Sequence, residues 1–384
     1  MGRKFTMALF AAIAVSTLAC GSNTVVHVDD DDGFSSGVIV GGSAGSTSAG
    51  GMGTSSSTGP GGGGGTTVPV LATGLEANDV ISDPLRSTFY ATIASTDQSF
   101  GNSLVVIDVD TGNVLSSVFV GSDPWRMALS DDLSTLWVSL KGSYSIRRID
   151  LTTEPPSPGP TYDLPLDQFN NQAYAGPMVV LPGTTESVAV SQHRVDVSPS
   201  YAGTIVLDAG VPRPNALPGH TGASRLTSGP PGWLFGFNDL STGFGFYAIV
   251  VDPSGVTSSE HKDLADGFST DITYHDGRVY ASNGSVVDVS NPSQPTKAGQ
   301  FPHAGPIAVV DGGNAVLMMT DGFEEQPMLR QLDTATFTVA GEVPLSDGAL
   351  DDVFRLTTPD GDHLAFIHRE DFDTTRLYLA TNPL

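Results

Sequence analysis

The chain has 384 residues and a formal charge of −25, carried by 42 acidic and 17 basic residues. This balance argues against nucleic-acid binding, which depends on Lys and Arg replacing phosphate counterions, and against a basic membrane-surface patch. It favours solubility outside the cell. The 45 Gly and 26 Pro residues, with only 15% charged residues, predict short strands joined by turns together with a low-complexity segment, and argue against a helical protein.

The first 19 residues have the pattern of a secretory signal peptide. Arg3 and Lys4 give a positive start, and residues 5–19, FTMALFAAIAVSTLA, form an uncharged apolar run. A basic region followed by an apolar one is typical of an export signal. The run is shorter than the roughly 20 residues of a membrane span, so we expect residues 1–19 to be removed on export.

Cys20, the one cysteine of the chain, stands directly after this run. The stretch TLAC from Thr17 to Cys20 resembles the bacterial lipobox, although that pattern usually has Leu at the position of Thr17. The resemblance implies a bacterial lipoprotein in which Cys20 is lipid-modified, and Gly21 in place of Asp implies the outer membrane of a Gram-negative source. Several acyl chains would anchor the protein firmly, since one chain binds only marginally. The alternative is an ordinary signal peptide cleaved near Ala19.

Residues 20–67 predict a disordered tether. Their stretch SAGSTSAGGMGTSSSTGPGGGGGTT is almost purely Gly, Ser, Thr and Ala. Such a segment buries too little apolar surface to offset its ordering entropy. A flexible chain of this length spans roughly 40 Å, which would hold the following domain away from a lipid surface.

Residues 68–384 predict an all-β domain. Short apolar runs of period two recur there, such as SLVVIDV, TLWVSL and RLYLA, without a sustained helical stripe. Repeats of roughly 40–50 residues with four strands each are typical of β-propeller blades and argue against a set of β-sandwich domains. We predict seven blades, with six or eight as alternatives. The units lie at 79–121, 122–175, 176–221, 222–267, 268–303, 304–350 and 351–384.

The last of these units is one strand short. The stretch TTVPVLATG at 66–74 is similar to GEVPLSDG at 341–348, the outer strand of the preceding unit. We therefore expect the N-terminal strand to complete the last blade and close the ring, which removes exposed sheet edges.

Two segments resemble known repeat families. The stretch NSLVVIDVDTGNVLSSVFVGSDPWRMALSDDLSTLWVSLKGSYSIRRIDLTT at 102–153 resembles the YVTN-type bacterial propeller repeat, with TLWVSL at the place of that family's name motif. RVYASNGSVVDVSNPSQPTKAGQF at 278–301 is similar to the LVIVD-type repeat. Both families are propellers often found on bacterial surface proteins, so the resemblance implies the same fold and a surface location.

No motif for catalysis or metal binding is found. The eight His residues show no HExxH or HxH spacing, and the sequence has no GxSxG elbow or P-loop. We therefore predict no metal, cofactor or catalytic residue, although a Ser/His/Asp triad with distant members leaves no sequence motif. DVDTGN at 108–113 looks like the start of a calcium loop but lacks its closing Glu, and a hairpin turn with Gly112 at positive φ is the stronger interpretation.

Aligning the seven units places charged residues in the predicted central channel, which the first strand of each blade lines. They alternate in sign among apolar strand starts, where unpaired charges are costly. In one interpretation they pair with each other and plug the channel. In the other, the channel mouth binds a small polar or anionic ligand through Arg126 and Arg225, with Trp125 at the rim. The aligned residues are Asp79, Arg126 and Arg225 in one register, and Asp271 and Arg355 one residue further along.

These features lead to three functional hypotheses. The first is a monomeric, non-catalytic binding or scaffolding module at the cell envelope, whose face of long loops, such as 152–177, takes protein or glycan partners. The second is a propeller enzyme of hydrolase, lactonase or quinone-type dehydrogenase class with its site at the channel mouth. The third is an envelope assembly factor that holds other outer-membrane proteins.

Overall fold

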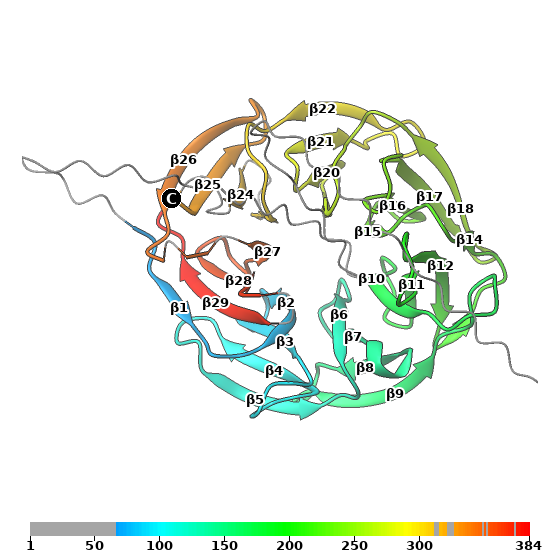
Figure 1. Ribbon diagram of the computed structural model, residues 1–384, viewed down its shortest axis with the longest axis horizontal. Helices are drawn as coiled ribbons and strands as arrows, with labels where there is room; N and C mark the ends of the chain where they lie inside the picture. The colour runs from blue at the N-terminus through cyan, green and yellow to red at the C-terminus, as the bar shows by residue number, and fades with distance from the viewer. Residues whose placement is uncertain (1–66, 311–314, 321–325, 348, 351, 372–373) are drawn as a thin grey trace, which may run out of the picture. The chain divides into compact units, whose positions relative to one another are not determined.

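The computed structural model describes residues 67–310, 315–320, 326–347, 349–350, 352–371 and 374–384. The predicted signal peptide, Cys20 and the tether as far as residue 66 lie outside these residues. The described strands form seven antiparallel sheets around a central axis (Figure 1). The prediction of a seven-bladed β-propeller is confirmed.

The first three blades follow each other along the chain. Blade 1 contains β2 (Ala77–Asp83), β3 (Thr88–Ile93), β4 (Ser103–Asp108) and β5 (Val114–Phe119). Blade 2 contains β6 (Pro124–Leu129), β7 (Thr135–Leu140), β8 (Ser145–Asp150) and β9 (Ser157–Asp163), with the short 3₁₀ helix η1 (Lys141–Ser143) before β8. Blade 3 contains β10 (Tyr174–Val180), β11 (Ser187–His193), β12 (Tyr201–Asp208) and an interrupted outer strand, β13 (Val211–Pro212) and β14 (Leu217–Pro218).

The next three blades repeat this order. Blade 4 contains β15 (Arg225–Ser228), β16 (Trp233–Phe237), β17 (Phe246–Asp252) and β18 (Gly255–His261). Blade 5 contains β19 (Ile272–His275), β20 (Arg278–Ala281), β21 (Ser285–Asp288) and β22 (Thr296–Gln300). Blade 6 contains β23 (Ile307–Val309), β24 (Ala315–Thr320), β25 (Met328–Asp333) and β26 (Thr338–Pro344).

Blade 7 closes the ring with a strand from the other end of the domain. It contains β27 (Val353–Thr357), β28 (His363–Arg369) and β29 (Thr375–Thr381), and its outer strand is β1 (Val70–Ala72). Val70 is opposite Ala380 and Leu71 is opposite Leu379 in the antiparallel register. The expected closure of the ring by the N-terminal strand is therefore confirmed.

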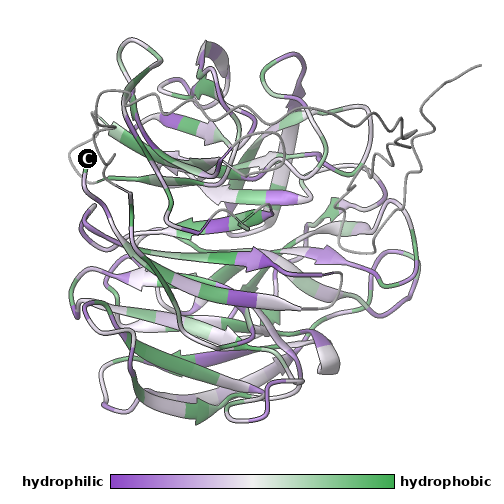
Figure 2. Cartoon of the chain, turned by 60° about the vertical axis from the view of Figure 1, so that its left-hand side comes forward, coloured by the Kyte–Doolittle hydropathy of each residue, from purple (hydrophilic) through white to green (hydrophobic). Residues whose placement is uncertain are grey.

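The position of a strand within its blade determines how its side chains are buried. β7, with the sequence TLWVSL, is buried at every residue, because a middle strand is covered on both faces by the neighbouring blades. The outer strand β5, VLSSVF, alternates between partly buried and exposed side chains, as a strand with one solvated face does. Figure 2 shows the resulting apolar runs along the strands.

The hydrophobic core lies between blades rather than at the axis. Seven clusters of buried described residues each join two neighbouring blades. Trp137 of β7 is fully buried between blades 2 and 3, and its Nε1 donates to the carbonyl oxygen of Thr185 at 3.1 Å. Each blade is thus held by packing on both faces, which makes the ring a rigid frame for residues at the axis.

The interpretation of residues 152–177 as one long loop is wrong. Residues 157–163 form β9, and the loop before β10 spans 164–173. The stretch was interpreted as a turn because it contains Pro158 and Pro160, but it forms β9, the outer strand of blade 2. Because such a strand pairs on one side only, it tolerates residues without a backbone N–H. Among the described residues no helix is long and apolar enough to span a membrane.

Candidate functional site

The central channel is a cavity of about 480 Å³ that residues from the first strands of all seven blades line. Figure 1 shows these inner strands facing the centre of the ring. The wall is mixed, with apolar side chains such as Ile81, Leu129 and Val309 between polar ones such as Thr227 and Thr357. Charged side chains gather at one end of this wall, where the first strands begin.

Arg355 is the centre of this charged group. Its Nε donates to Oδ1 of Asp79 at 2.9 Å, and its Nη1 donates to Oδ2 of Asp271 at 2.5 Å. Arg126 lies 3.7 Å from the same Asp79 oxygen. Residues from blades 1, 2, 5 and 7 therefore meet at the axis. We call the group of Asp79, Arg126, Arg225, Asp271 and Arg355 the axial charge cluster.

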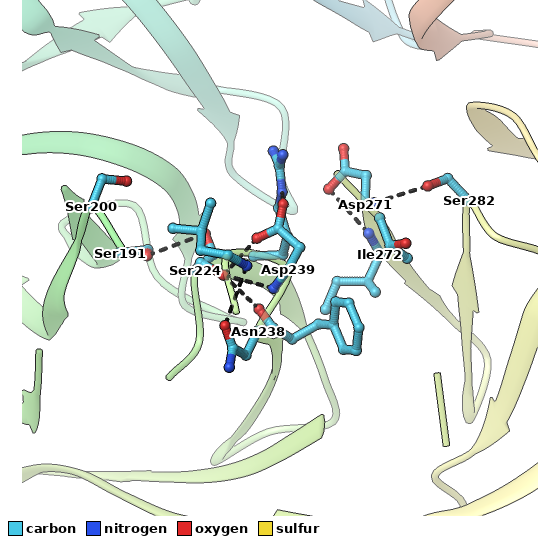
Figure 3. Close-up of polar contacts among 12 residues, drawn as sticks. Ser191, Ser200, Ser224, Asn238, Asp239, Asp271, Ile272 and Ser282 are labelled. Atoms are coloured by element: carbon cyan, nitrogen blue, oxygen red, sulfur yellow. Dashed lines mark hydrogen bonds and ion pairs between the residues drawn. The ribbon is translucent and has the colours of Figure 1, made fainter. Parts of the chain in front are cut away.

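Backbone contacts fix the two carboxylates of this cluster. Oδ2 of Asp79 accepts a hydrogen bond from the backbone N–H of Met127 at 2.9 Å, which ties blade 1 to blade 2. The backbone N–H of Asp271 donates to Ser282 Oγ at 2.9 Å, and Oδ1 of Asp271 accepts from the N–H of Ile272 at 3.0 Å (Figure 3). β-Bulges at Asp79 and Arg355 adjust the register of their strands, as bulges do where a side chain must be re-aimed.

Arg225 has a partner that the sequence did not reveal. Its Nε donates to Oδ2 of Asp239 at 2.8 Å, and both side chains are buried. Asp239 also accepts from Ser224 Oγ at 2.6 Å and returns a backbone N–H to it at 3.1 Å (Figure 3). Asp239 lies in the loop between β16 and β17, so an alignment of first strands could not include it. The Asn-Asp pair at 238–239, directly after a buried strand, is the signal that could have pointed to it.

Arg126 is the least satisfied member of the cluster. Its side chain is only 6% exposed, and its Nη1 atom has no hydrogen-bond partner among the residues that the structure describes. Its guanidinium carbon lies 5.0 Å from the centre of the Trp125 ring. The same ring lies 4.9 Å from Nζ of Lys141. Two cations thus lie over the ring of Trp125, which lines the small cavity beside His193 and is not among the lining residues of the channel or of the second cavity described below.

Burial and neighbouring charges shift the pKa values of the three arginines in different directions. Burial, together with the charges of Arg355 and Arg225, lowers the pKa of Arg126 to about 10. Burial also opposes the charge of Arg225 and Arg355, but nearby carboxylates raise the pKa of each above its usual value. For Asp271, burial is outweighed by the three arginines, which lower its pKa. The three arginines and Asp271 therefore remain ionised at neutral pH, and Arg126 is the most weakly compensated of these charges.

A second cavity lies on the other side of the cluster. It measures about 360 Å³, and we call it the vestibule. Phe268, Phe354 and Pro306 contribute apolar surface to its wall, together with small polar residues such as Ser282. Arg126, Asp271 and Arg355 line both the vestibule and the channel. The axial charge cluster therefore stands as a septum between the two cavities.

The interpretation in which the axial charges pair with each other and plug the channel is correct in part. Arg355, Asp79 and Asp271 do pair across the axis, and Arg225 pairs with Asp239. The pairing leaves Arg126 with one distant carboxylate and leaves an open vestibule above the septum. The ligand-binding interpretation therefore stays a prediction, which we develop below.

A buried histidine adjoins the cluster and was not singled out from the sequence. His193 Nδ1 is 3.1 Å from Ser200 Oγ, and its Nε2 is 3.2 Å from Ser191 Oγ and 3.3 Å from the carbonyl oxygen of Ser224. In the tautomer with a proton on Nε2, that nitrogen donates to the carbonyl, and Nδ1 accepts from Ser200. The adjoining cavity of about 30 Å³ has the volume of roughly one water molecule.

Among the described residues, no group of three or more His, Cys, Asp or Glu side chains is arranged to hold a metal ion. The segment DVDTGN is the hairpin turn that we predicted. Thr111 donates its backbone N–H and its hydroxyl to Asp108 Oδ1 at 2.8 and 2.6 Å. Gly112 has φ of 71°, a conformation that glycine adopts at no steric cost.

Fold and site together define a seven-bladed β-propeller with a charged septum across its channel. No family model and no curated protein matches the sequence. The structure is similar to hydrazine synthase from Kuenenia stuttgartiensis, at 13% identity and a TM-score of 0.56, over 82% of this chain and 97% of that one. It is similar to the WD40 repeats of RRP9, at 12% identity and a TM-score of 0.57, over 81% and 97%.

A third similar structure is the dihydro-heme d1 dehydrogenase NirN, at 16% identity and a TM-score of 0.50, over 80% of this chain and 66% of that one. These similarities concern the fold alone, because the same fold carries unrelated functions. One of the three is a WD40 repeat domain and two are named as enzymes, so function must be argued from the site.

Proposed function

We propose that this chain is a non-catalytic binding module whose ligand site is the vestibule. The observation that carries the proposal is the vestibule itself, a cavity of about 360 Å³ with three guanidinium groups from three blades among its lining residues. Small-molecule sites are typically about 300–1,000 Å³ and combine apolar walls with a few convergent polar groups. The vestibule has this size, and its lining combines apolar side chains such as Phe268 and Phe354 with a larger share of polar ones.

The frame around the vestibule supports a preformed site. Two of its charged lining residues, Arg355 and Asp271, are held by a hydrogen bond between blades, and Arg355 also donates to Asp79 of blade 1. The blades themselves are joined by apolar clusters on both faces. A site held in this way loses little conformational entropy when a ligand binds.

The location of the module is part of the proposal. We infer export by residues 1–19, lipid attachment at Cys20, and a tether that extends to residue 67, with the outer membrane as the destination in a Gram-negative source. The module would act as a monomer, because one ring contains a complete vestibule. The propeller repeats of YVTN and LVIVD type that the sequence resembles fit a surface role.

Protein or glycan partners could use the loops on the vestibule side. These loops precede the first strands or join second to third strands, and they carry exposed apolar side chains, unlike typical solvated loops. The residues concerned are Leu166, Phe169, Val195, Val197 and Phe268.

A thermal-shift screen of small acids, sugars and amines tests the vestibule as the site. Ala304 is exposed at the vestibule wall, so Ala304→Trp fills the cavity without removing a charge. Ala340 is exposed on β26 at the outside of the same blade, and Ala340→Trp is the matched control. We expect a compound that stabilises the wild type and Ala340→Trp but not Ala304→Trp. Equal stabilisation of all three, or no stabilising compound, would refute the proposal.

A second candidate is a hydrolase that uses Ser200 and His193. The observation in its favour is the 3.1 Å contact between Ser200 Oγ and His193 Nδ1, since an adjacent base activates a serine nucleophile. Both residues are buried, and the adjoining cavity of about 30 Å³ has no room for a substrate unless the loop at 194–200 moves. Labelling of Ser200 by a fluorophosphonate, lost in His193→Gln, would favour this candidate over the binding module.

A further inference from the structure

The vestibule carries an excess of positive charge in an acidic protein. Its lining includes three guanidinium groups and two carboxylates, those of Asp271 and Asp352, whereas the whole chain has a formal charge of −25. Asp79 lines the channel and Asp239 lines the small cavity beside His193, so neither carboxylate faces the vestibule. The lining itself therefore has one more cation than carboxylate, while Asp79 and Asp239 compensate Arg355 and Arg225 from outside it.

Arg126 is the least compensated of the three cations. Arg355 has two close carboxylates and Arg225 has Asp239, but Arg126 has only Asp79 at 3.7 Å, and that oxygen already accepts from Arg355. A buried charge without close partners is costly, and Nη1 of Arg126 has no hydrogen-bond partner among the described residues. Arg126 is among the residues that line the vestibule, so an anion there would lie next to the least compensated guanidinium group.

The shape of the donor and the nearby carboxylates select the kind of anion. A guanidinium group offers parallel N–H donors that match the two oxygens of a carboxylate. A dianion such as phosphate would be repelled by Asp271, which lies in the same floor. A monoanion brings one negative charge next to Arg126 and is repelled less by Asp271 than a dianion is.

Part of the remaining wall is apolar and fits an apolar tail. Phe268 is 49% exposed and contacts Phe244 edge-on, with ring centres 5.1 Å apart. Phe354 and Pro306 lie in the same wall. At about 360 Å³ the vestibule has room for one small organic acid or for the last residue of a peptide, and both carry the same carboxylate chemistry.

We propose that the vestibule binds a monocarboxylate with an apolar tail, whose carboxylate compensates Arg126. This inference rests on the proposed function and deepens it. The source of the carboxylate is either a free organic acid or the C-terminus of a protein chain, and the test below separates the two.

Titration calorimetry on the full chain in detergent is the first measurement. The probes are 3-phenylpropionate, the neutral 3-phenylpropan-1-ol, inorganic phosphate, and an eight-residue peptide ending in Phe with a free or an amidated C-terminus. We expect 3-phenylpropionate to bind at least about tenfold more tightly than the alcohol or phosphate, because hydrogen bonds to charged groups are the strong ones. Tighter binding of the free-acid peptide than of 3-phenylpropionate identifies a chain end, and the reverse order identifies a free acid.

Variants then connect binding to Arg126. Arg126→Gln should weaken binding of 3-phenylpropionate by about 10- to 100-fold, and Arg126→Lys, which keeps the charge but loses the fork, by less. Arg213→Gln removes a guanidinium from the outside of blade 3, where Arg213 pairs with Asp208, and should leave binding unchanged. The comparison of acid and alcohol on the wild type needs no variant, so it decides the question even where Arg126→Gln fails to fold.

The outcomes separate this inference from the proposed function. The carboxylate inference is overturned if 3-phenylpropionate binds no more tightly than the alcohol or than phosphate. It is also overturned if Arg126→Gln and Arg213→Gln bind 3-phenylpropionate with equal affinity. If a different compound from the screen still requires an open vestibule, the proposed function stands without it. If no compound distinguishes Ala304→Trp from Ala340→Trp, the two fall together.

Discussion

Arg355 on β27 and Asp79 on β2 form an ion pair of 2.9 Å although they are 276 positions apart in the chain. β27 belongs to the last blade and β2 to the first, so this pair lies at the junction where the ring closes. At the outside of the same junction, β1 pairs with β29. The ring is thus closed once at its axis, by side chains, and once at its circumference, by backbone hydrogen bonds.

The axial closure should make a large contribution to stability. Asp79→Asn removes the carboxylate that Arg355 and Arg126 share, and we expect the free energy of unfolding to fall by about 3 kcal/mol, because breaking a buried pair leaves a charge uncompensated. Urea denaturation followed by tryptophan fluorescence measures this change. Asp252→Asn, at an exposed turn, should change stability by less than about 0.5 kcal/mol. A loss at Asp79 no greater than at Asp252 would contradict the expectation.

The circumferential closure depends on backbone pairing of a short strand. Leu71→Pro removes a backbone N–H from β1, and we expect a loss of about 2 kcal/mol, the cost of a hydrogen-bonding group left without its partner. Leu71→Ala is the control, because Leu71 is 49% exposed and its side chain adds little packing. Limited proteolysis and urea denaturation report the difference. Similar behaviour of the two variants would mean that β1 is dispensable for closure.

His363 links the first and last blades in a pH-dependent way. Its Nδ1 is 2.7 Å from Asp360 Oδ2 and its Nε2 is 3.0 Å from Asp110 Oδ1. The hydrogen bond that His363 donates to Asp360 raises the pKa of His363, burial opposes the rise, and the charges of Asp360 and Asp110 add to it. A raised pKa means that the stabilisation is complete below the unfolded value of about 6.5 and is lost as pH rises through the higher folded value.

We therefore expect His363→Gln to lower the melting temperature by about 2 °C at pH 5.5 and by less at pH 9, a size that fits exposed ion pairs. Asp110→Asn should reproduce part of this pH dependence, since it removes one of the two carboxylates. Calorimetry at the two pH values measures it. A deficit that is as large at pH 9 as at pH 5.5 would show that the histidine acts through packing alone.

The proposed lipid anchor gives a prediction outside the folded domain. Cys20→Ser removes the thiol that would carry the lipid, and we expect the protein to move from the membrane fraction to the soluble fraction of an exporting cell, because acyl chains supply the membrane affinity. Incorporation of labelled palmitate should be lost in parallel. Retention of the variant in the membrane fraction would argue for a different anchor.

The sequence was sufficient for the blades but only partly for the site. Period-two runs and the repeat length reveal strands and blade number because each strand must present one face to a neighbouring blade. The similarity of residues 66–74 to an outer strand revealed the closure. β9 was missed because Pro158 and Pro160 resemble a turn, and on an outer strand proline is tolerated.

At the axis, the first-strand alignment found the charges of Asp79, Arg126 and Arg355 because all of them lie on one kind of strand. It could not find Asp239, since that residue reaches Arg225 across a hairpin. Whether an arginine has a close carboxylate depends on distances that differ by less than an ångström or so and on the direction of its side chain. Neither quantity is encoded in strand periodicity.

Val68, at the start of the domain, is held in place by burial and by backbone hydrogen bonds. This residue is fully buried, its N–H donates to Pro344 at 2.9 Å, and its carbonyl oxygen accepts from Ser346 at 2.8 Å. A pull on the chain from its N-terminal side would reach Val68 and the junction of blades 6 and 7 before it reached β1. If the proposed tether is under load, the force would therefore act first on the buried backbone pairing at the rim, far from the vestibule at the axis.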